Sequence, residues 1–253
     1  MKNILILLVL LFNFTNANTQ VNGSGAAAAP EMSSLKTANL TFNIDPFGVY
    51  DVDGMVKGMR YADISGTPFV FGDWRKATIY DIGLHPIATI KVKYNSYSDQ
   101  IHFLDEKETE LVANKEIIKK VVLLYDSADG SKEIVLEKGF TDSKSILRSH
   151  QFVQVLNDGK VQLLKQNTNK IIQKDSLFAT LKVNAFSENT FYFLKYTPTS
   201  VEKLRKLDQA ELYALLPNKA IIEEYSKKKS KLKNEKDFIN FLNYYNQQVA
   251  TLP

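Results

Sequence analysis

The sequence predicts an α+β protein in which an antiparallel β-meander, curled or partly closed, is followed by a three-helix C-terminal segment packed on it. Short β-prone runs separated by turn residues fill 66–196, and no helical periods lie between them. This spacing favours an antiparallel meander over a βαβ fold. After 207 the apolar residues recur at helical spacing behind N-capping residues. Strands first and helices last is the order typical of α+β proteins.

The best-defined strand pair is a hairpin. Alternating apolar residues at 152–156 and 161–164 flank Asn157-Asp158-Gly159-Lys160, and Asp-Gly readily adopts the positive φ angles of a tight turn. Before it, Leu40, Phe42 and Ile44 alternate as a short strand would. Further strands are expected at 67–71, 77–80, 88–94, 100–104, 119–125, 133–138, 171–172 and 191–195.

Three helices are expected at the C-terminal end. Asp208 with Glu211 has the spacing of a capping box and would begin a helix that ends before Pro217. Asn218 and Asn234 can cap the second and third. The apolar stripe of the third helix is formed by Phe238, Phe241, Leu242 and Tyr245. We therefore divide the chain into an antiparallel β region, 39–200, and a helical region packed on it, 201–253.

The N-terminus is predicted to be a secretory signal peptide. Lys2 precedes an apolar run from Ile4 to Phe14, and the small residues Thr15-Asn16-Ala17 suit a cleavage site. The run is too short for a membrane span, which takes about 20 apolar residues. Cleavage near Ala17 would remove 1–17 and leave a Gly-, Ala- and Ser-rich flexible leader, 18–38. The expected location is the periplasm or the exterior of a Gram-negative bacterium.

The amino-acid composition excludes cysteine-based chemistry and argues against nucleic acid as a partner. The 253 residues contain no cysteine, which excludes disulfides, thiol nucleophiles and Cys-ligated zinc. Lys and Arg number 32 against 28 acidic residues, a net charge of +4 that is too small to indicate nucleic acid as a partner. Clustered lysines after 218 are interleaved with acids, as on a solvated helix face, although they could also hold an anionic lipid or polysaccharide.

Four segments form a recognisable set: Gly66-Thr67-Pro68-Phe69, Tyr94 to Ile101, the 156–164 hairpin, and the tail from Leu215-Leu216-Pro217 to Asn243-Tyr244-Tyr245-Asn246. Together they resemble a loose family of uncharacterised exported proteins of Gram-negative bacteria. The resemblance covers most of the chain after Gly66. It implies an exported α+β protein of unassigned activity and transfers no catalytic residue.

Catalytic signals are sparse. His85, His102 and His150 are far apart and show no zinc spacing, so no metal or cofactor is predicted. His85 is expected in a turn before Pro86, and His102 is expected to face solvent from its strand. No Gly-x-Ser-x-Gly elbow or equivalent serine-hydrolase set is present.

Carboxylates leave two alternatives open. Asp51-Val52-Asp53-Gly54 resembles part of a calcium loop, but its Gly is misplaced and a turn explains it better. A carboxylate-dependent hydrolase would need two acids facing each other at roughly 5–10 Å. Its candidate members are Asp73, Asp81, Asp99 and Asp105, and sequence spacing does not show which of them converge.

The segment between two expected strands at 94–100 is the predicted ligand-binding site. Its aromatic and polar side chains form the amphipathic surface typical of recognition sites. The predicted ligand-binding residues are Tyr94, Asn95, Tyr97, Asp99 and Gln100. The alternative is an ordinary connecting turn in which the polar side chains bond the backbone and the tyrosines pack over the sheet edge.

Three function hypotheses follow. The first is a non-enzymatic module that binds an envelope protein or glycan through its sheet or loops. The second is a carboxylate-dependent hydrolase of envelope or extracellular polymers, with a tyrosine or Trp74 as a sugar platform. The third is an assembly role for the helical tail, which would require an exposed stripe at Phe238, Phe241 and Tyr245.

Overall fold

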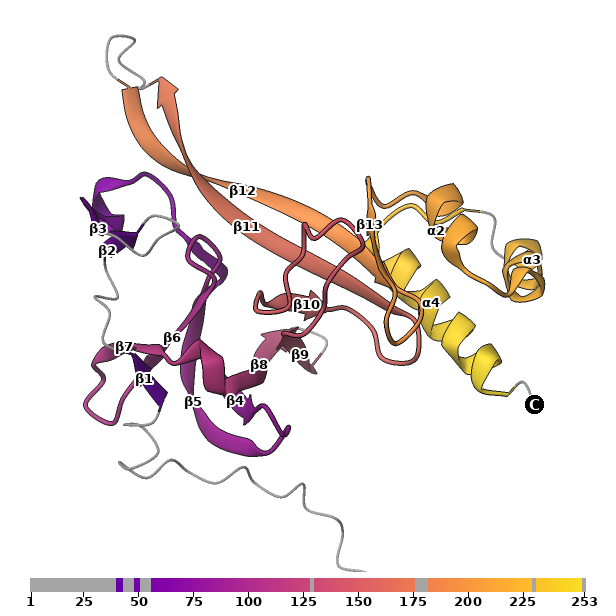
Figure 1. The fold of residues 1–253 in the computed structure, drawn as a ribbon, viewed down its shortest axis with the longest axis horizontal. Coiled ribbons are helices and arrows are strands. Elements are labelled where there is room, and N and C mark those ends of the chain that lie inside the picture. Colours follow the sequence, from indigo (N-terminus) through magenta and orange to yellow (C-terminus); the bar gives the residue numbers. More distant parts are fainter. Residues whose placement is uncertain are drawn as a thin grey trace, which may run out of the picture.

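A computed structural model describes residues 40–42, 48–50, 56–127, 130–175, 182–228 and 231–251. Its centre is an antiparallel sheet of eleven strands in the order β1-β7-β6-β5-β4-β8-β9-β10-β11-β12-β13, and a two-stranded sheet, β2-β3, lies beside it. Three helices follow the strands and gather at one end of the molecule (Figure 1). The predicted α+β class is confirmed; the large sheet is open, with β1 and β13 at its two edges.

The elements have the following bounds: β1 (Thr41–Phe42), β2 (Gly48–Tyr50), β3 (Val56–Arg60), η1 (Tyr61–Asp63), β4 (Phe69–Asp81), β5 (Pro86–Asn95), β6 (Gln100–Leu104), β7 (Glu110–Ala113), η2 (Lys115–Ile117), β8 (Ile118–Ser127), β9 (Gly130–Glu137), β10 (Val153–Val155), β11 (Gln162–Asp175), β12 (Lys182–Lys195), β13 (Val201–Leu204), α2 (Gln209–Leu215), α3 (Lys219–Lys228) and α4 (Glu235–Ala250).

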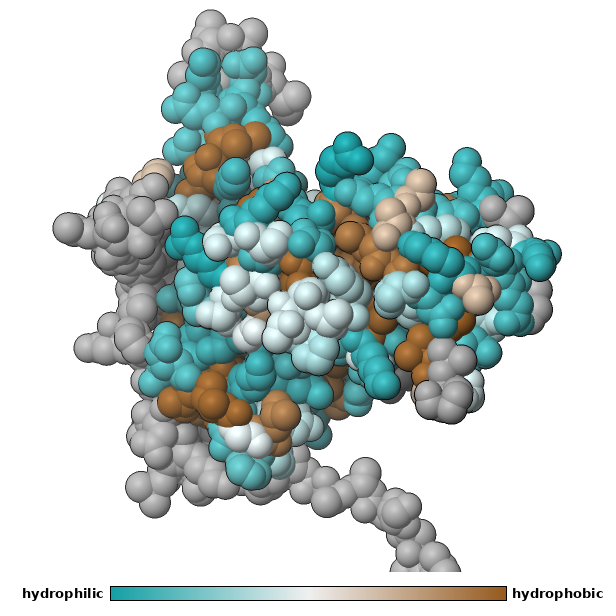
Figure 2. Space-filling view, turned by 45° about the vertical axis from the view of Figure 1, so that its right-hand side comes forward, coloured by the Kyte–Doolittle hydropathy of each residue, from teal (hydrophilic) through white to brown (hydrophobic). Residues whose placement is uncertain are grey.

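Two meanders make up the large sheet. Strands β4 to β7 pair in sequence, as do β8 to β13, and the pairing of β4 with β8 joins the two runs. The second run contains the longest pairing, in which β11 and β12 stay in register from Gln162↔Lys195 to Asp175↔Lys182. The distal end of this pair, beyond Ile172↔Ala185, projects from the body as a two-stranded arm (Figures 1 and 2).

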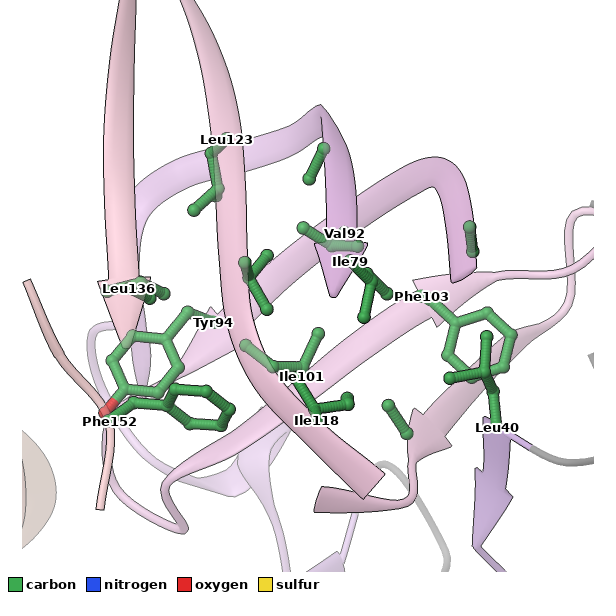
Figure 3. Close-up of a cluster of buried hydrophobic side chains, with 14 residues drawn as sticks. Leu40, Ile79, Val92, Tyr94, Ile101, Phe103, Ile118, Leu123, Leu136 and Phe152 are labelled. Atoms are coloured by element: carbon green, nitrogen blue, oxygen red, sulfur yellow. The ribbon is translucent and has the colours of Figure 1, made fainter. Parts of the chain in front are cut away.

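Two large hydrophobic cores flank the sheet. The first lies among β4 to β9 and includes Ile79, Val92, Phe103, Leu123 and Phe152 (Figure 3). The second lies between the β11–β13 end of the sheet and the three helices, where Leu163 and Leu194 meet the stripe of α4. Burial of that stripe confirms that the helices pack on the sheet. It also removes the exposed stripe that an assembly role for the tail would have required.

The helices begin where local capping predicts. The Asp208 carboxylate accepts from the amides of Ala210 and Glu211, and the Asn234 side chain accepts from the amide of Asp237. Asn218 accepts from the amide of Ile221 at the start of α3. The boundary at 201 needs correction, because β13 occupies Val201–Leu204 and pairs with β12 before the first helix begins at Gln209.

Strand bounds differ from the sequence expectation where tertiary contacts decide them. β4 is one strand from Phe69 to Asp81 rather than two, because a bulge with positive φ at Phe71 and Gly72 absorbs the register shift between Val70 and Arg75. β11 continues through the polar stretch 165–170, which no apolar alternation marks. The expected calcium-like turn at 51–54 and the third residue of the 40–44 alternation, Ile44, lie outside the described residues.

Two asparagines hold the predicted hairpin between β10 and β11, which the structure confirms. The Asn157 side chain donates to the Val161 carbonyl and accepts from the Leu163 amide within the hairpin. From α4, the Asn246 side chain accepts from the Val161 amide at 2.9 Å and donates to the carbonyls of Val161 and Asp158. Gly159, with φ of 114°, leaves room for Asn246, since a Cβ there would lie 2.5 Å from its amide nitrogen. The last helix, α4, is therefore attached to the hairpin by the hydrogen bonds of Asn246.

Asn246→Ala is expected to lower the free energy of unfolding by about 2 kcal/mol, because it leaves the amide of buried Val161 without its partner. Asn243→Ala, at an exposed position of the same helix, is the matched control and should change stability by less than about 0.5 kcal/mol. Urea unfolding followed by circular dichroism measures both. Equal effects for the two variants would show that the Asn246 contacts do not fasten the helix.

Candidate functional site

The predicted ligand segment 94–100 forms the turn between β5 and β6, as expected, but much of it is buried. Tyr94 is 3% exposed and Asn95 is fully buried. The turn lies where parts of the chain far apart in sequence meet: the Ser96 amide donates to the Pro68 carbonyl, and the Asn169 amide of β11 donates to the Ser96 carbonyl. The segment is thus a joint between the two meanders.

The Asp99 side chain links three separate parts of the chain at this joint. One carboxylate oxygen accepts from the Tyr94 hydroxyl at 2.9 Å and from the Phe152 amide at 3.1 Å, and the other pairs with the Lys115 ammonium. Its φ of 53° is in the left-handed region, which Asp tolerates better than most residues. The Tyr94 and Phe152 rings meet edge to face beside it, 6.2 Å apart (Figure 3).

Burial is the largest influence on the pKa values of Asp99 and Tyr94. It raises the pKa of the Asp99 carboxyl above its ordinary value of 3.8, and the opposing attraction of Lys115 does not reverse the shift. Burial, followed by the charge of Asp99, raises the pKa of the Tyr94 hydroxyl well above 10.0. The Tyr94 hydroxyl therefore stays protonated and donates to Asp99 throughout the physiological range.

Asn95 organises the turn through both ends of its amide. Its oxygen accepts from the amides of Tyr97 and Ser98, which fixes the orientation of the side chain. Its nitrogen consequently points to the Tyr61 hydroxyl at 2.7 Å and to Nε2 of His102 at 3.5 Å. We assign Nε2 of His102 as an acceptor on this ground, so the ring proton lies on Nδ1.

His102 contradicts the expectation that it faces solvent: it is fully buried. β6 lies between β5 and β7, and the Phe69 ring covers the imidazole edge to face at 5.1 Å. Nδ1 of His102 contacts the Glu110 carboxylate at 2.8 Å. The other Glu110 oxygen accepts from the Lys93 ammonium at 3.2 Å. We call His102, Glu110 and Lys93 the buried ionic triad.

Two aromatic rings complete the environment of the triad. The Lys93 ammonium lies 4.2 Å from the ring centroids of both Phe69 and Trp74. Burial raises the pKa of Glu110, but the hydrogen bond from His102 and the nearby Lys93 outweigh it, so the pKa of this carboxyl is lowered from 4.5. Sequence reasoning missed the triad, since finding it requires the cross-strand register Lys93↔His102 and Leu104↔Glu110.

The remaining predicted residues lie at the edge of the joint. Tyr97 is half-buried and packs edge to face on Phe186 of β12, with centroids 5.8 Å apart. Gln100 lines a small hollow of about 180 Å³ together with Ser98, Asn114 and Lys115. The Ser98 hydroxyl is buried there without a hydrogen-bond partner. Of the predicted set, Gln100 therefore borders open space, whereas Tyr94, Asn95 and Asp99 bond to the protein itself.

A larger hollow of about 370 Å³ lies against β5 and the β6–β7 turn. Its walls are Thr89, Ile90 and Lys91 on one side and residues from 104 to 108 on the other, including Asp105, Glu106 and Glu108. Among the described residues that line it there is no aromatic one, and Trp74 lies on Lys93 instead. Within the described ranges, no group of three His, Asp or Glu residues could hold a metal ion.

His85 occupies a turn, as expected. Its amide donates to the Asp81 carboxylate at 2.9 Å, and this contact, ahead of those with its imidazole, lowers the pKa of Asp81. Asp73, Asp81, Asp99 and Asp105 have different partners: Asp73 bonds the Trp74 amide and Asp105 bonds amides of its own turn. Each of these acids therefore has partners of its own, and two of those of Asp99, Lys115 and Phe152, come from distant parts of the chain.

Comparison with protein-family models, with curated proteins and with solved structures finds no match to this chain. The resemblance to exported Gram-negative proteins therefore stays a prediction. Among the helices that the structure describes, none is long and apolar enough to cross a membrane.

Proposed function

We propose that the protein is exported to the periplasm or the exterior and acts there as a non-enzymatic binding or interaction module. The observation that carries the proposal is that the side chains of His102 and Asp99 bond to other residues of the protein itself. Nδ1 of His102 is occupied by Glu110, and Asp99 is occupied by Tyr94, Phe152 and Lys115. A general acid or base must reach a proton on a bound substrate, and these atoms face their own neighbours instead.

Export rests on the N-terminal sequence, which has the basic start, short apolar run and small-residue end of a signal peptide. The fold supports the binding role. An open sheet offers unpaired strand edges, and the projecting β11–β12 arm exposes Ile172 and Val183 to solvent. A protein of this build offers surfaces to partners rather than a closed pocket to a substrate.

The hydrolase alternative would use the hollow that contains Asp105, Glu106 and Glu108. Asp105 accepts from the amides of Lys107 and Thr109, so its first role is to shape the turn. Glu108 pairs with Lys91 across the hollow at 3.7 Å. The described residues of the lining include no aromatic sugar platform of the kind that Trp74 was expected to supply. These features favour binding over hydrolysis.

The test uses the full chain expressed in a Gram-negative host with a C-terminal tag. We expect the protein in the periplasmic or medium fraction at the mass left by cleavage near Ala17. Incubated with peptidoglycan sacculi, lipopolysaccharide or casein, it should release no fragments detectable by mass spectrometry above a heat-unfolded control. Unprocessed cytoplasmic protein would refute export. Fragment release that Glu106→Gln/Glu108→Gln abolishes would replace the binding role with hydrolysis.

A further inference from the structure

Part of β5 has no paired strand on one side among the described residues, although β5 lies in the interior of the strand order. β5 pairs with β4 along its length, yet it pairs with β6 only from Val92 to Asn95. β6 ends at Leu104 and turns into β7, so 86–91 has no strand on its outer side among the described residues. Alternate backbone N–H and C=O groups of an unpaired edge point outward and can accept another strand.

The 370 Å³ hollow occupies the place that a longer β6 would fill. Thr89, Ile90 and Lys91 of the unpaired stretch form one wall, and the β6–β7 turn forms the other. The hollow and the missing strand therefore coincide. An extended chain placed there would lie next to β5, in line with the end of β6.

The two ends of this edge differ in character. At the β6–β7 turn, Glu106 and Glu108 are exposed, and the Lys91–Glu108 pair joins two largely solvated side chains. Such a pair stabilises little, so a second cation can take its place beside Glu108. At the opposite end, the β4–β5 turn exposes Ile82 and Leu84 by 60% and 53% of their surface. One end suits a basic side chain and the other suits an apolar one.

The edge is protected at its Pro86 end, where the register between β4 and β5 shifts by one residue at Ile87, but residues 88–90 have no such protection against strand addition. Proteins shield edges with prolines, charges or bulges. Pro86 and Lys91 stand at the two ends, whereas Ile87 and Ile90 between them are half-buried and pack on the first core. Residues 88–90 thus present backbone groups without a charge, a proline or a register shift among them.

We propose that an extended segment of a partner protein adds to β5 along 86–91 as an extra strand, with a basic side chain at Glu106 and Glu108 and an apolar one at Ile82 and Leu84. Main-chain hydrogen bonds to β5 would supply affinity, and the two ends would set the direction and register of the added strand. The inference rests on the proposed binding role and names its partner class.

Two synthetic peptides of opposite order test the site on the full-length exported protein. They are Lys-Thr-Val-Thr-Val-Thr-Leu and Leu-Thr-Val-Thr-Val-Thr-Lys, each labelled for fluorescence anisotropy. We expect one order to bind saturably. Replacing its Lys by Glu should weaken binding at least about tenfold, and N-methylation of the peptide nitrogens that face β5 should abolish it.

Two pairs of variants complete the design. Glu106→Lys/Glu108→Lys should weaken the affinity for the peptide that binds by at least about tenfold. Ile82→Ser/Leu84→Ser, at the other end of the edge, should also weaken that affinity. Glu133→Lys/Glu188→Lys, on exposed positions of β9 and β12, makes the same charge change elsewhere and should leave binding unchanged. Absence of saturable binding for both peptides, or equal loss in both charge variants, overturns the strand-addition site.

The same samples separate this inference from the proposed function. Mass spectrometry of the bound peptide should show an intact chain. A cleaved peptide would refute the non-enzymatic role, whatever its affinity for β5. Intact peptide without binding would refute the β5 site and leave the non-enzymatic role standing.

Discussion

Asp99→Ala is expected to lower the free energy of unfolding by about 4 kcal/mol. The change leaves the Tyr94 hydroxyl and the Phe152 amide, both in buried residues, without an acceptor, and it removes the counter-charge of Lys115. Each buried donor left unpaired costs about 1–3 kcal/mol. Alanine also tolerates the left-handed backbone at this position less well than Asp. Urea unfolding monitored by circular dichroism and by Trp74 fluorescence measures the loss.

Asp99→Asn is the matched variant, and it should cost only about 1 kcal/mol. Asparagine keeps an acceptor oxygen for Tyr94 and Phe152 and tolerates positive φ. It loses the charge, but burial already disfavours that charge, because the pKa of Asp99 is raised above 3.8 in the folded protein. Similar losses for Asp99→Ala and Asp99→Asn would show that the ion pair with Lys115, and not the acceptor geometry, holds the joint.

The raised pKa also gives Asp99 a direction of pH dependence. Between the ordinary pKa of 3.8 and the higher folded value, the folded state binds more protons than the unfolded state. The stability that Asp99 contributes is therefore fully present below 3.8 and is lost as the pH rises through the folded pKa. Asp99→Asn should remove this slope from the acid side of the stability profile.

Local rules account for the parts of the fold that the sequence predicts well. Asp208, Asn218 and Asn234 each satisfy amides within their own first turn, so the helix starts can be read without knowing the neighbours. The hairpin at 152–164 is partly local, because Gly159 supplies the positive φ and Asn157 bonds within its own loop, whereas Asn246 reaches the loop from α4. Each of these signals lies within a few residues of the structure it specifies.

The parts that sequence reasoning missed depend on contacts between distant segments. Strand β11 crosses the polar stretch 165–170 because Asn169 bonds Ser96 and the Pro68 carbonyl from the first meander. His102 is buried because the five-residue turn 105–109 and β7 return the chain beside β6 and bring Glu110 to its ring. Alternation along one strand cannot reveal a second covered face.

The burial of the predicted ligand segment depends on distant contacts in the same way, and the bonds of Asn95 to the amides of Tyr97 and Ser98 agree with the connecting-turn alternative. Residues 94–100 have the composition of a recognition loop, and the turn itself is where it was expected. Its polar groups are used internally because Phe152 and Lys115 arrive from elsewhere to meet Asp99. The β5 edge had no sequence signal, since an unpaired edge results from β6 being shorter than its neighbour.

Glu110→Ala is the second large expected effect, a loss of about 3 kcal/mol at neutral pH. It leaves Nδ1 of fully buried His102 without an acceptor and the Lys93 ammonium without its counter-charge. Removing one partner of a buried ion pair typically costs about 3–5 kcal/mol, and the Phe69 and Trp74 rings retain part of the stabilisation of Lys93. Lys93→Met/Glu110→Ala should lose less than Glu110→Ala alone, because the uncompensated charge is gone.

The pH dependence of the stability that Glu110 contributes runs opposite to that of Asp99. It therefore distinguishes the contribution of the buried ionic triad from that of the joint. The folded pKa of Glu110 lies below 4.5, so the unfolded state binds more protons in the window between the folded value and 4.5. Its contribution is present above 4.5 and is lost as the pH falls through the folded pKa. The deficit of Glu110→Gln relative to the unaltered protein, measured by urea unfolding, should therefore shrink on acidification. A deficit that stays constant from neutral pH to below that window would show that the carboxylate charge of Glu110 does not stabilise the buried ionic triad.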